Sequence, residues 1–528
     1  MSILNRLKIM SLKLISKINA RTRITVFRLG GLFAVALLLL SVTSSFYESG
    51  NRKIVLTPVS QLSGEQLQKK PNIIVVLSEA FWDPTVMENV KFSRDPIPFF
   101  HALAGQYSSG WLFSPQFGGV TANVEFEVLT GNSVRFLSTD TVAYEQHVKT
   151  NIDSLASILS GQGYTAKAIS PFHNWFANSR ETYQRFGFSR FISMEFFNPN
   201  EYEGPYLADR AVAKRIIEET QKTDGPDFIY ANTMENHYHF WPGKFKHNTI
   251  DVKGDLPRVD AGLLETYAQG ISDADRMLEQ LVSHYSQSGE PTVIVFFGDH
   301  LPFLEDDYMV YVDAKYISGE SDPDFLTKIH RTPVIVWNNF AGKPRDDLNI
   351  SPSFLSPYVL HLAGLQGTDY TNYLYDLSRK IPVIPPKEYY EKFHIQEADL
   401  QEYEQRQQAM LAGELTDQSP RSIAMGYGDP ALNDYEPKEI TAGDSFRTDA
   451  GRSTLIVRGG PFGLGSTVLI DGKPQPTTWQ SESALTVVLP KETYASPGSL
   501  DVQVKVIDEK ETVLAESKPV RIKVLSKP

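Results

Sequence analysis

The 528-residue sequence contains no cysteine. This absence excludes disulfide bonds, thiolate metal sites and a cysteine nucleophile. The sequence also lacks an excess of basic residues, because its formal net charge is −12 at pH 7. A protein that binds nucleic acid needs a basic face that displaces counterions from phosphates, so this charge argues against a nucleic-acid partner. Long hydrophobic runs are missing too, with one exception near the N-terminus.

That exception is residues 29–47, "LGGLFAVALLLLSVTSSFY", an uncharged stretch long enough to cross roughly 30 Å of hydrocarbon. Basic residues precede it with no acidic residue among them: Arg6, Lys8, Lys13, Lys17, Arg21, Arg23 and Arg28. The positive-inside bias predicts a cytoplasmic segment at 1–28, a transmembrane anchor at 29–47 and export of the rest. The alternative is a cleaved signal peptide, since "SVTSS" offers small residues.

With 41% hydrophobic and 22% charged residues, the composition is that of a folded protein too long for one ordinary core. After a polar stalk at 48–70, short apolar runs alternate with segments of helical periodicity. The predicted strands are 72–78, 164–170, 227–233, 292–297 and 333–337. This alternation predicts an α/β domain over 71–415, with a doubly wound, mainly parallel sheet covered on both faces.

The last part of the chain has a different pattern. A charged stretch with one helical segment leads into a predicted linker at 416–438. Residues 439–528 then alternate apolar and polar at period two, with turn residues between the runs. We therefore predict a separate immunoglobulin-like β-sandwich over 439–528.

Polar residues follow several of the predicted strands. Glu79 comes directly after the first run, His237 lies just past the third, and Asp299 and His300 follow the fourth. Ligands bind beyond the carboxyl ends of the strands in such sheets. The sequence therefore predicts that carboxylates and imidazoles gather at one rim of the sheet.

The segment "PQFGGVTANVEFEVLTG" places Thr121 after two glycines. A threonine hydroxyl is a poor nucleophile unless a base or a metal activates it. Mg²⁺ and Mn²⁺ prefer oxygen ligands, and Mn²⁺ also accepts imidazole. Glu79, Thr121, Asp299 and His300 therefore form a candidate ligand set for one divalent ion, either Mn²⁺ or Mg²⁺, with Thr121 as the nucleophile. Gly118 and Gly119 would let a phosphate approach the backbone.

Four motifs, "NIIVVLSEAF", "GGVTANVEF", "NHYHF" and "FFGDH", resemble those of the lipoteichoic acid synthase group of the alkaline phosphatase superfamily. This group includes phosphoglycerol transferases that act on membrane oligosaccharides. The resemblance spans roughly 70–415 and implies a sulfatase-like fold. It matches Glu79, Asp299 and His300 to metal ligands and Thr121 to the nucleophile that also touches the ion. In the C-terminal region, "GGPFGLGSTVLIDG" and "SALTVVLP" resemble the sequence of an IPT/TIG immunoglobulin-like domain.

The resemblance also implies substrate contacts. His237 matches the histidine that contacts glycerol phosphate in that family. Trp175 and Arg180 are candidates for a family aromatic and arginine, although their spacing does not superpose on the family pattern. His173 is a further candidate, with packing against Trp175 as the alternative. His239 is a weaker alternative to His237.

Other acidic residues near these motifs have simpler explanations. Glu125 and Glu127 are expected in the first turn of a helix, where the dipole favours acids. Thr121 itself has the alternative role of a helix N-cap. Asp273 and Asp275 lie in a helical pattern and are expected at the surface.

The resemblance implies an anchored, extracytoplasmic transferase that moves glycerol phosphate from a phosphatidylglycerol-type lipid to a hydroxyl of a glycan or polyglycerol phosphate acceptor, through a covalent threonine intermediate. The alternatives are a phosphoethanolamine transferase, a metal-dependent phosphodiesterase, or a non-catalytic wall- or lipid-binding protein. A sulfatase activity is disfavoured, because no cysteine is present and no serine stands in an S-x-P-x-R setting.

Overall fold

The computed structural model describes residues 54, 56–59, 62–340, 345–449 and 452–528. The predicted cytoplasmic segment at 1–28 and the predicted anchor at 29–47 lie outside these residues. Among the residues that are described, no helix is both long and apolar enough to cross a membrane.

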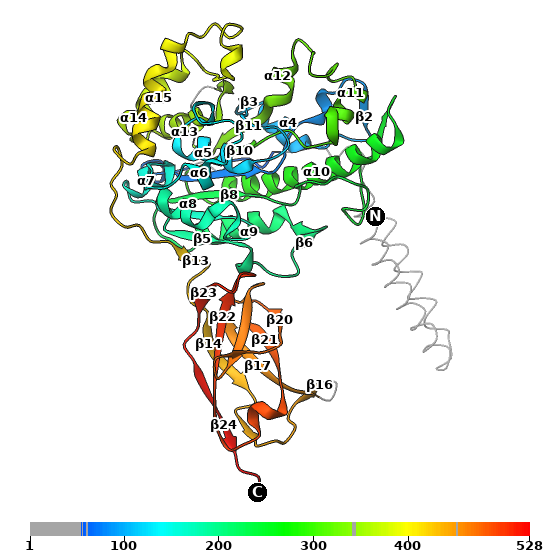
Figure 1. Ribbon diagram of the computed structural model, residues 1–528, viewed down its shortest axis with the longest axis vertical. Coiled ribbons are helices and arrows are strands. Elements are labelled where there is room, and N and C mark those ends of the chain that lie inside the picture. The colour runs from blue at the N-terminus through cyan, green and yellow to red at the C-terminus, as the bar shows by residue number, and fades with distance from the viewer. Residues whose placement is uncertain (1–53, 55, 60–61, 341–344, 450–451) are drawn as a thin grey trace, which may run out of the picture. The chain divides into compact units, whose positions relative to one another are not determined.

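A nine-stranded sheet forms the centre of the α/β region, in the order β12-β3-β11-β10-β1-β8-β4-β5-β13 (Figure 1). In that order the strands are Asp347–Ile350, Ser108–Phe113, Arg331–Asn338, Thr292–Gly298, Asn72–Ser78, Asp227–Asn232, Thr165–Ile169, Arg190–Ile192 and Ala424–Met425. All but β11 run in one direction. The predicted mainly parallel α/β sheet is therefore confirmed, with β11 reversed between β10 and β3.

The central strands β1 and β10 are buried along their whole length. This burial explains their unbroken apolar sequences, because helices cover both faces of such a sheet. The longer helices of the region are α4 (Pro98–Ala104), α5 (Thr121–Thr130), α8 (Ser179–Phe186), α9 (Asp209–Thr220), α10 (Arg258–Gln287), α13 (Leu355–Ala363), α14 (Asp369–Ser378) and α15 (Glu397–Leu411). The segments of helical periodicity coincide with α9, with α10 from residue 267 onward, and with α15.

The C-terminal region contains two sheets that share one apolar core. The first has the order β14-β17-β21-β20, and the second has the order β15-β24-β22-β18-β19. Their strands are Ala431–Glu436, Arg452–Gly460, Ala484–Leu489, Thr477–Ser481, Glu439–Thr441, Val520–Leu525, Gly498–Ile507, Ser466–Ile470 and Lys473–Pro474. A β-sandwich is therefore present, and its likeness to an IPT/TIG domain stays a prediction. Within the predicted linker at 416–438, β13 pairs with the large sheet and β14 with the sandwich.

The expectation that Asp275 lies at the surface is wrong. Its carboxylate is buried and accepts hydrogen bonds from the backbone N–H groups of Phe99 (3.0 Å) and Phe100 (2.7 Å), at the start of α4. The helical pattern alone could not reveal this contact, because α4 is far from α10 in the sequence. Asp273 is partly buried.

Candidate active site

Three ligand-type side chains meet at the carboxyl ends of β1 and β10. Glu79, Asp299 and His300 each place one ligand atom within 4.8 Å of the others. His300 Nε2 lies 3.2 Å from Asp299 Oδ2 and 3.7 Å from Glu79 Oε1. The parallel pairing of Ser78 with Gly298 brings the two strand ends side by side, and this pairing explains why residues 220 positions apart in the chain converge.

The hydrogen bonds of this cluster favour a bound cation. His300 Nδ1 lies 2.9 Å from the carbonyl oxygen of Leu301, so Nδ1 carries the proton and the Nε2 lone pair faces the carboxylates. Asp299 Oδ2 and His300 Nε2 are buried and have no hydrogen-bond partner. Burial, and then the charge of Asp299, raise the pKa of Glu79 well above its ordinary value. These three side chains therefore fit a divalent ion. Such an ion would offset the repulsion between the Glu79 and Asp299 carboxylates and would bind the two polar atoms that have no partner.

The rest of the cluster is held by neutral groups. The Asp299 Oδ1 atom accepts a hydrogen bond from the Ala80 N–H at 2.8 Å. The Glu79 N–H donates to Thr233 Oγ1 at 3.1 Å, just beyond β8. The Asp299 carboxylate is thus fixed in direction while its Oδ2 stays available, and the backbone of Glu79 is tied to the end of β8.

Thr121 lies beside this cluster. Its Oγ1 donates to Glu79 Oε2 at 3.3 Å. Thr121 is the first residue of α5, and the residue before it, Val120, has φ +60°, a left-handed conformation that is rare for a β-branched residue. Gly118 also has a positive φ of +69°, and a side chain there would crowd Phe303. Gly119 faces open space. The strained turn therefore leaves the hydroxyl next to the carboxylate with room in front of it.

The alternative that Thr121 caps α5 is not supported, because the capping position is Val120 and no side-chain cap bond forms.

The expectation that Glu125 and Glu127 are first-turn acids is also wrong, since the first turn of α5 contains no acidic residue. Both side chains are buried. Glu125 accepts from Tyr144, Tyr183 and Asn232, and Glu127 accepts from Ser133 and Val134. They anchor the helix that carries Thr121.

A hollow of about 140 Å³ opens in front of the cluster. Its lining includes Glu79, His300, the two glycines of the Thr121 loop and His237. His237 Nδ1 lies 3.0 Å from the carbonyl oxygen of Tyr238, which makes Nδ1 the protonated nitrogen and leaves Nε2 as an acceptor. Burial lowers the pKa of His237 below its ordinary value, and the neighbouring Lys244 and His300 act in the same direction. His237 is therefore a neutral imidazole able to accept a proton or a hydroxyl hydrogen bond.

The remaining predicted substrate residues lie outside the lining of this hollow. The ring of His173 stacks on Trp175 with centroids 5.1 Å apart, in the loop that follows β4. Arg180 lies in the first turn of α8, and its backbone N–H donates to the Asn174 carbonyl at 3.0 Å. His239 is exposed and contacts Trp241 at 4.5 Å between centroids. The structure thus gathers Glu79, Thr121, Asp299, His300 and His237, while the others border the same rim further away.

Residues 71–365, more than half of the chain, match the sulfatase family. The chain belongs to that family. Its residues are 40% identical over 323 positions to a Rhizobium meliloti (strain 1021) protein named for modification of cyclic beta-1,2-glucan, covering 60% of this chain and 50% of that protein. They are 26% identical over 315 positions to the lipoteichoic acid synthase of Staphylococcus saprophyticus, covering 57% and 46%. The chain thus spans about half the length of these relatives.

A solved structure has the same fold. The phosphoglycerol transferase GacH of Streptococcus pyogenes, in complex with sn-glycerol-1-phosphate, superposes with a TM-score of 0.52 at 21% identity, covering 66% of this chain and 95% of its own. This likeness supports the sulfatase-like α/β fold. The sulfatase match ends at residue 365, well before the C-terminal sandwich.

One residue that the sequence did not single out lies behind this sulfatase-like site. Lys244 is buried, and its Nζ donates to the His237 carbonyl at 2.5 Å. Its ammonium lies 4.8 Å from the Phe240 ring centre. Burial lowers the pKa of Lys244 to about 8, although Glu235 and Glu79 favour its charged form. A lysine in a polar loop gives no signal of this burial, because the rings of Tyr206, Phe240 and Phe245 gather around its ammonium only in the folded chain.

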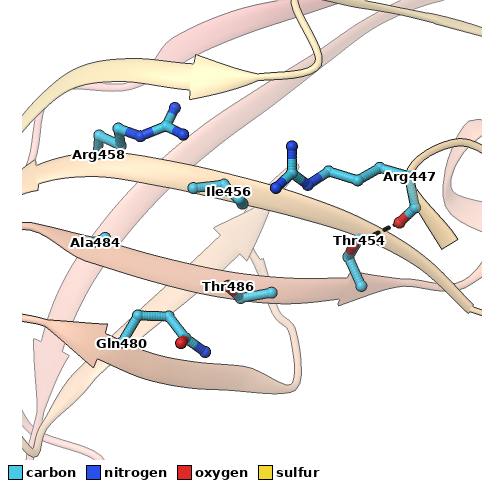
Figure 2. A pocket seen from close by; sticks show the side chains of 7 residues that line it. All are labelled: Arg447, Thr454, Ile456, Arg458, Gln480, Ala484 and Thr486. Atoms are coloured by element: carbon cyan, nitrogen blue, oxygen red, sulfur yellow. Dashed lines mark hydrogen bonds between the residues drawn. The ribbon is translucent and has the colours of Figure 1, made fainter. Parts of the chain in front are cut away.

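A second hollow, of about 560 Å³, lies on the outer face of the sandwich sheet β14-β17-β21-β20 (Figure 2). It is lined by Arg447, Thr454, Ile456, Arg458, Gln480, Ala484 and Thr486. Both guanidinium groups already bond to Glu436, at 2.7 Å and 3.2 Å. This hollow therefore has neither the unmet charges nor the nucleophile of the rim.

Proposed function

We propose that this protein is a metal-dependent phosphoglycerol transferase that moves glycerol phosphate from a phosphatidylglycerol-type lipid to a hydroxyl acceptor through a covalent intermediate on Thr121. The observation that carries the proposal is the 3.3 Å contact between Thr121 Oγ1 and Glu79 Oε2, beside Asp299 and His300. A nucleophile next to oxygen and imidazole ligands is the arrangement that metal-assisted phosphoryl transfer requires.

A divalent ion, when bound, would lower the pKa of the Thr121 hydroxyl and draw charge from the phosphoryl oxygens. Glu79, Asp299 and His300 would hold it. The Thr121 oxygen then attacks the phosphorus of the lipid, the bond from phosphorus to the diacylglycerol oxygen breaks, and the diacylglycerol leaves with the proton that Thr121 gives up. The acceptor hydroxyl next attacks the same phosphorus, and the threonine hydroxyl is restored. In this proposal His237 takes the acceptor's proton through Nε2 and passes it to the departing Thr121 oxygen.

The donor is confined to a bilayer, so the proposal includes the anchor predicted at 29–47, with the catalytic region outside the cytoplasm. Tethering raises the effective concentration of a lipid donor at the site. A glycan or a polyglycerol phosphate chain would serve as acceptor. The likeness to a lipoteichoic acid synthase and to a phosphoglycerol transferase supports a transferase reaction over the hydrolysis that a phosphodiesterase performs.

Intact-mass measurement after incubation with phosphatidylglycerol and Mn²⁺ tests the proposal. A glycerol phosphate adduct that maps to Thr121 in the wild type, and is absent in Thr121→Ala, is the expected result. A phosphoethanolamine adduct after incubation with phosphatidylethanolamine would instead identify the alternative donor. Release of free glycerol phosphate without any adduct would contradict the covalent mechanism.

A further inference from the structure

The C-terminal sandwich is joined to the α/β region through backbone contacts. The Leu464 N–H donates to the Phe197 carbonyl at 2.9 Å, and the Gly465 N–H donates to the Glu195 carbonyl at 2.8 Å. A side chain at Gly463 would lie 2.6 Å from the Phe196 carbonyl carbon. This approach is therefore possible only because glycine occupies position 463.

A buried cation also links the two regions. Arg215 on α9 is 3% exposed, and its guanidinium bonds to Glu482 of the sandwich at 2.7 Å. The same group lies 5.4 Å from the ring centre of Tyr427. Arg215 also bonds to Glu218 of its own helix at 2.6 Å, and the side chain of Glu482 is 41% exposed, so the pair adds a partly exposed ionic contact between the regions.

One turn of the sandwich reaches the loop that follows β4. This turn, residues 508–512, joins β22 to β23 (Val513–Glu516). Asp508 Oδ1 accepts from the backbone N–H groups of Lys510 (2.9 Å) and Thr512 (2.8 Å), which fixes the shape of the turn. Asp508 Oδ2 accepts from Asn174 Nδ2 at 3.0 Å. Asn174 also donates to Glu195 at 3.0 Å, and all three side chains are buried.

The same turn contacts two of the aromatic rings of this loop, those of Trp175 and His173. The Lys510 ammonium lies 3.6 Å from the centre of the Trp175 ring, a close cation–π contact. Glu509 Oε2 lies 3.5 Å from His173 Nε2. Three consecutive residues of the sandwich thus contact three consecutive residues of the α/β region.

This loop borders the catalytic rim. It leaves the carboxyl end of β4, the neighbour of β8, and β8 in turn lies beside β1, whose end carries Glu79. The loop continues directly into α8, where Tyr183 donates to Glu125 at 2.7 Å. Glu125 belongs to α5, one turn beyond Thr121. The sandwich turn therefore contacts a loop whose other end is bonded to the helix of the nucleophile.

We propose that the C-terminal sandwich is a positioning part of the catalytic unit and not a spacer. Its 508–512 turn holds the loop at 171–178 against the rim, with Asp508 and Lys510 as positioning residues, and so sets how substrate is bound. The effect on substrate binding rests on the proposed transferase function. The claim that the turn holds the loop in place does not.

The first experiment uses hydrogen exchange in the full chain without substrate, read by mass spectrometry over residues 171–178. Lys510→Ala removes the ring contact from an exposed position, so the fold is expected to persist. Arg458→Ala, on the Figure 2 face of the same sandwich, is the matched control. We expect exchange at 171–178 to rise about threefold in Lys510→Ala, and more in Asn174→Ala, with no change in the control. Unchanged exchange in both loop variants would overturn the proposal.

The second experiment measures transfer from phosphatidylglycerol vesicles with Mn²⁺. Lys510→Ala is expected to raise KM about threefold, with kcat and Mn²⁺ binding unchanged, and Lys510→Arg is expected to restore KM. A KM equal to that of Arg458→Ala would overturn the role in substrate binding even if exchange rises. Absence of turnover in the unaltered chain would overturn the transferase function instead, and the exchange result alone would then decide whether the turn holds the loop.

Discussion

The rim of the large sheet and the outer face of the sandwich are both rich in charged groups, yet they are built differently. At the rim, Asp299 Oδ2 and His300 Nε2 are buried without partners. On the sandwich face, Arg447 and Arg458 are exposed or half-exposed and bonded to Glu436 (Figure 2). A polar group whose bonds are complete needs no ligand, whereas a buried unmet one does. Buried polar atoms without hydrogen-bond partners therefore indicate the reactive site better than charge or the volume of a hollow does.

The largest effect is expected from Thr121→Ala. Loss of the nucleophile should lower transfer by roughly 10³-fold or more, while Mn²⁺ still binds through the other three side chains. Thr121→Ser keeps the hydroxyl and is the control, with substantial activity retained. Transfer rates and Mn²⁺ calorimetry on the three proteins make the check. Full activity in the alanine variant would remove the covalent mechanism.

Glu79→Gln should have opposite effects on the stability of the metal-free protein and on Mn²⁺ binding. Replacing a buried, repelled carboxylate is expected to stabilise the metal-free protein by about 1 kcal/mol or more. The same change should abolish the rise in melting temperature that Mn²⁺ gives the wild type. Glu127→Gln is the matched control, because that buried carboxylate already accepts bonds from Ser133 and Val134. Thermal unfolding with and without Mn²⁺ measures both effects. A control that behaves like Glu79→Gln would break the comparison between a carboxylate repelled by its neighbour and one whose hydrogen bonds are complete.

Metal binding should weaken as the pH falls. Burial and Asp299 raise the pKa of Glu79 in the metal-free protein, so a proton competes with the ion for this carboxylate. The folded metal-free state then binds more protons than the unfolded chain, and its stability should grow as the pH falls through the raised pKa. Calorimetry in buffers of different ionisation enthalpy should detect proton release on Mn²⁺ binding. Affinity that does not vary between pH 8 and pH 5 would count against the cluster as the site.

The smallest effect is expected on the sandwich face. Arg458→Ala removes an exposed guanidinium whose ion pairs lie at the surface, so unfolding free energy should change by about 0.5 kcal/mol or less. Metal affinity and transfer should remain those of the wild type. Denaturant unfolding and the transfer assay provide the measurement. A loss of activity as large as that of a rim variant would mean that this face contributes to the function.

Much of the rim could be predicted because its residues directly follow features that are recognisable in the sequence, namely apolar strand runs and a pair of glycines. Glu79 and Asp299 directly follow the apolar runs of β1 and β10, and Thr121 follows two glycines. The rule that parallel strands end at one edge was then enough to bring them together.

What could not be predicted depends on contacts between distant segments. The burial of Glu125 arises from Tyr144, Tyr183 and Asn232, which lie in three other elements. Lys244 is buried beside the rings of Tyr206, Phe240 and Phe245, and Tyr206 belongs to a distant segment. The apolar pattern of a strand does not show whether the strand runs parallel or antiparallel to its neighbours. The antiparallel direction of β11 therefore could not be predicted.

The most direct test of the account is a crystal of the chain soaked in Mn²⁺ and measured for anomalous scattering. We expect one strong peak within about 2.0–2.3 Å of Glu79, Asp299, His300 and Thr121 Oγ1. A peak elsewhere, or none at this rim at saturating Mn²⁺, would contradict it.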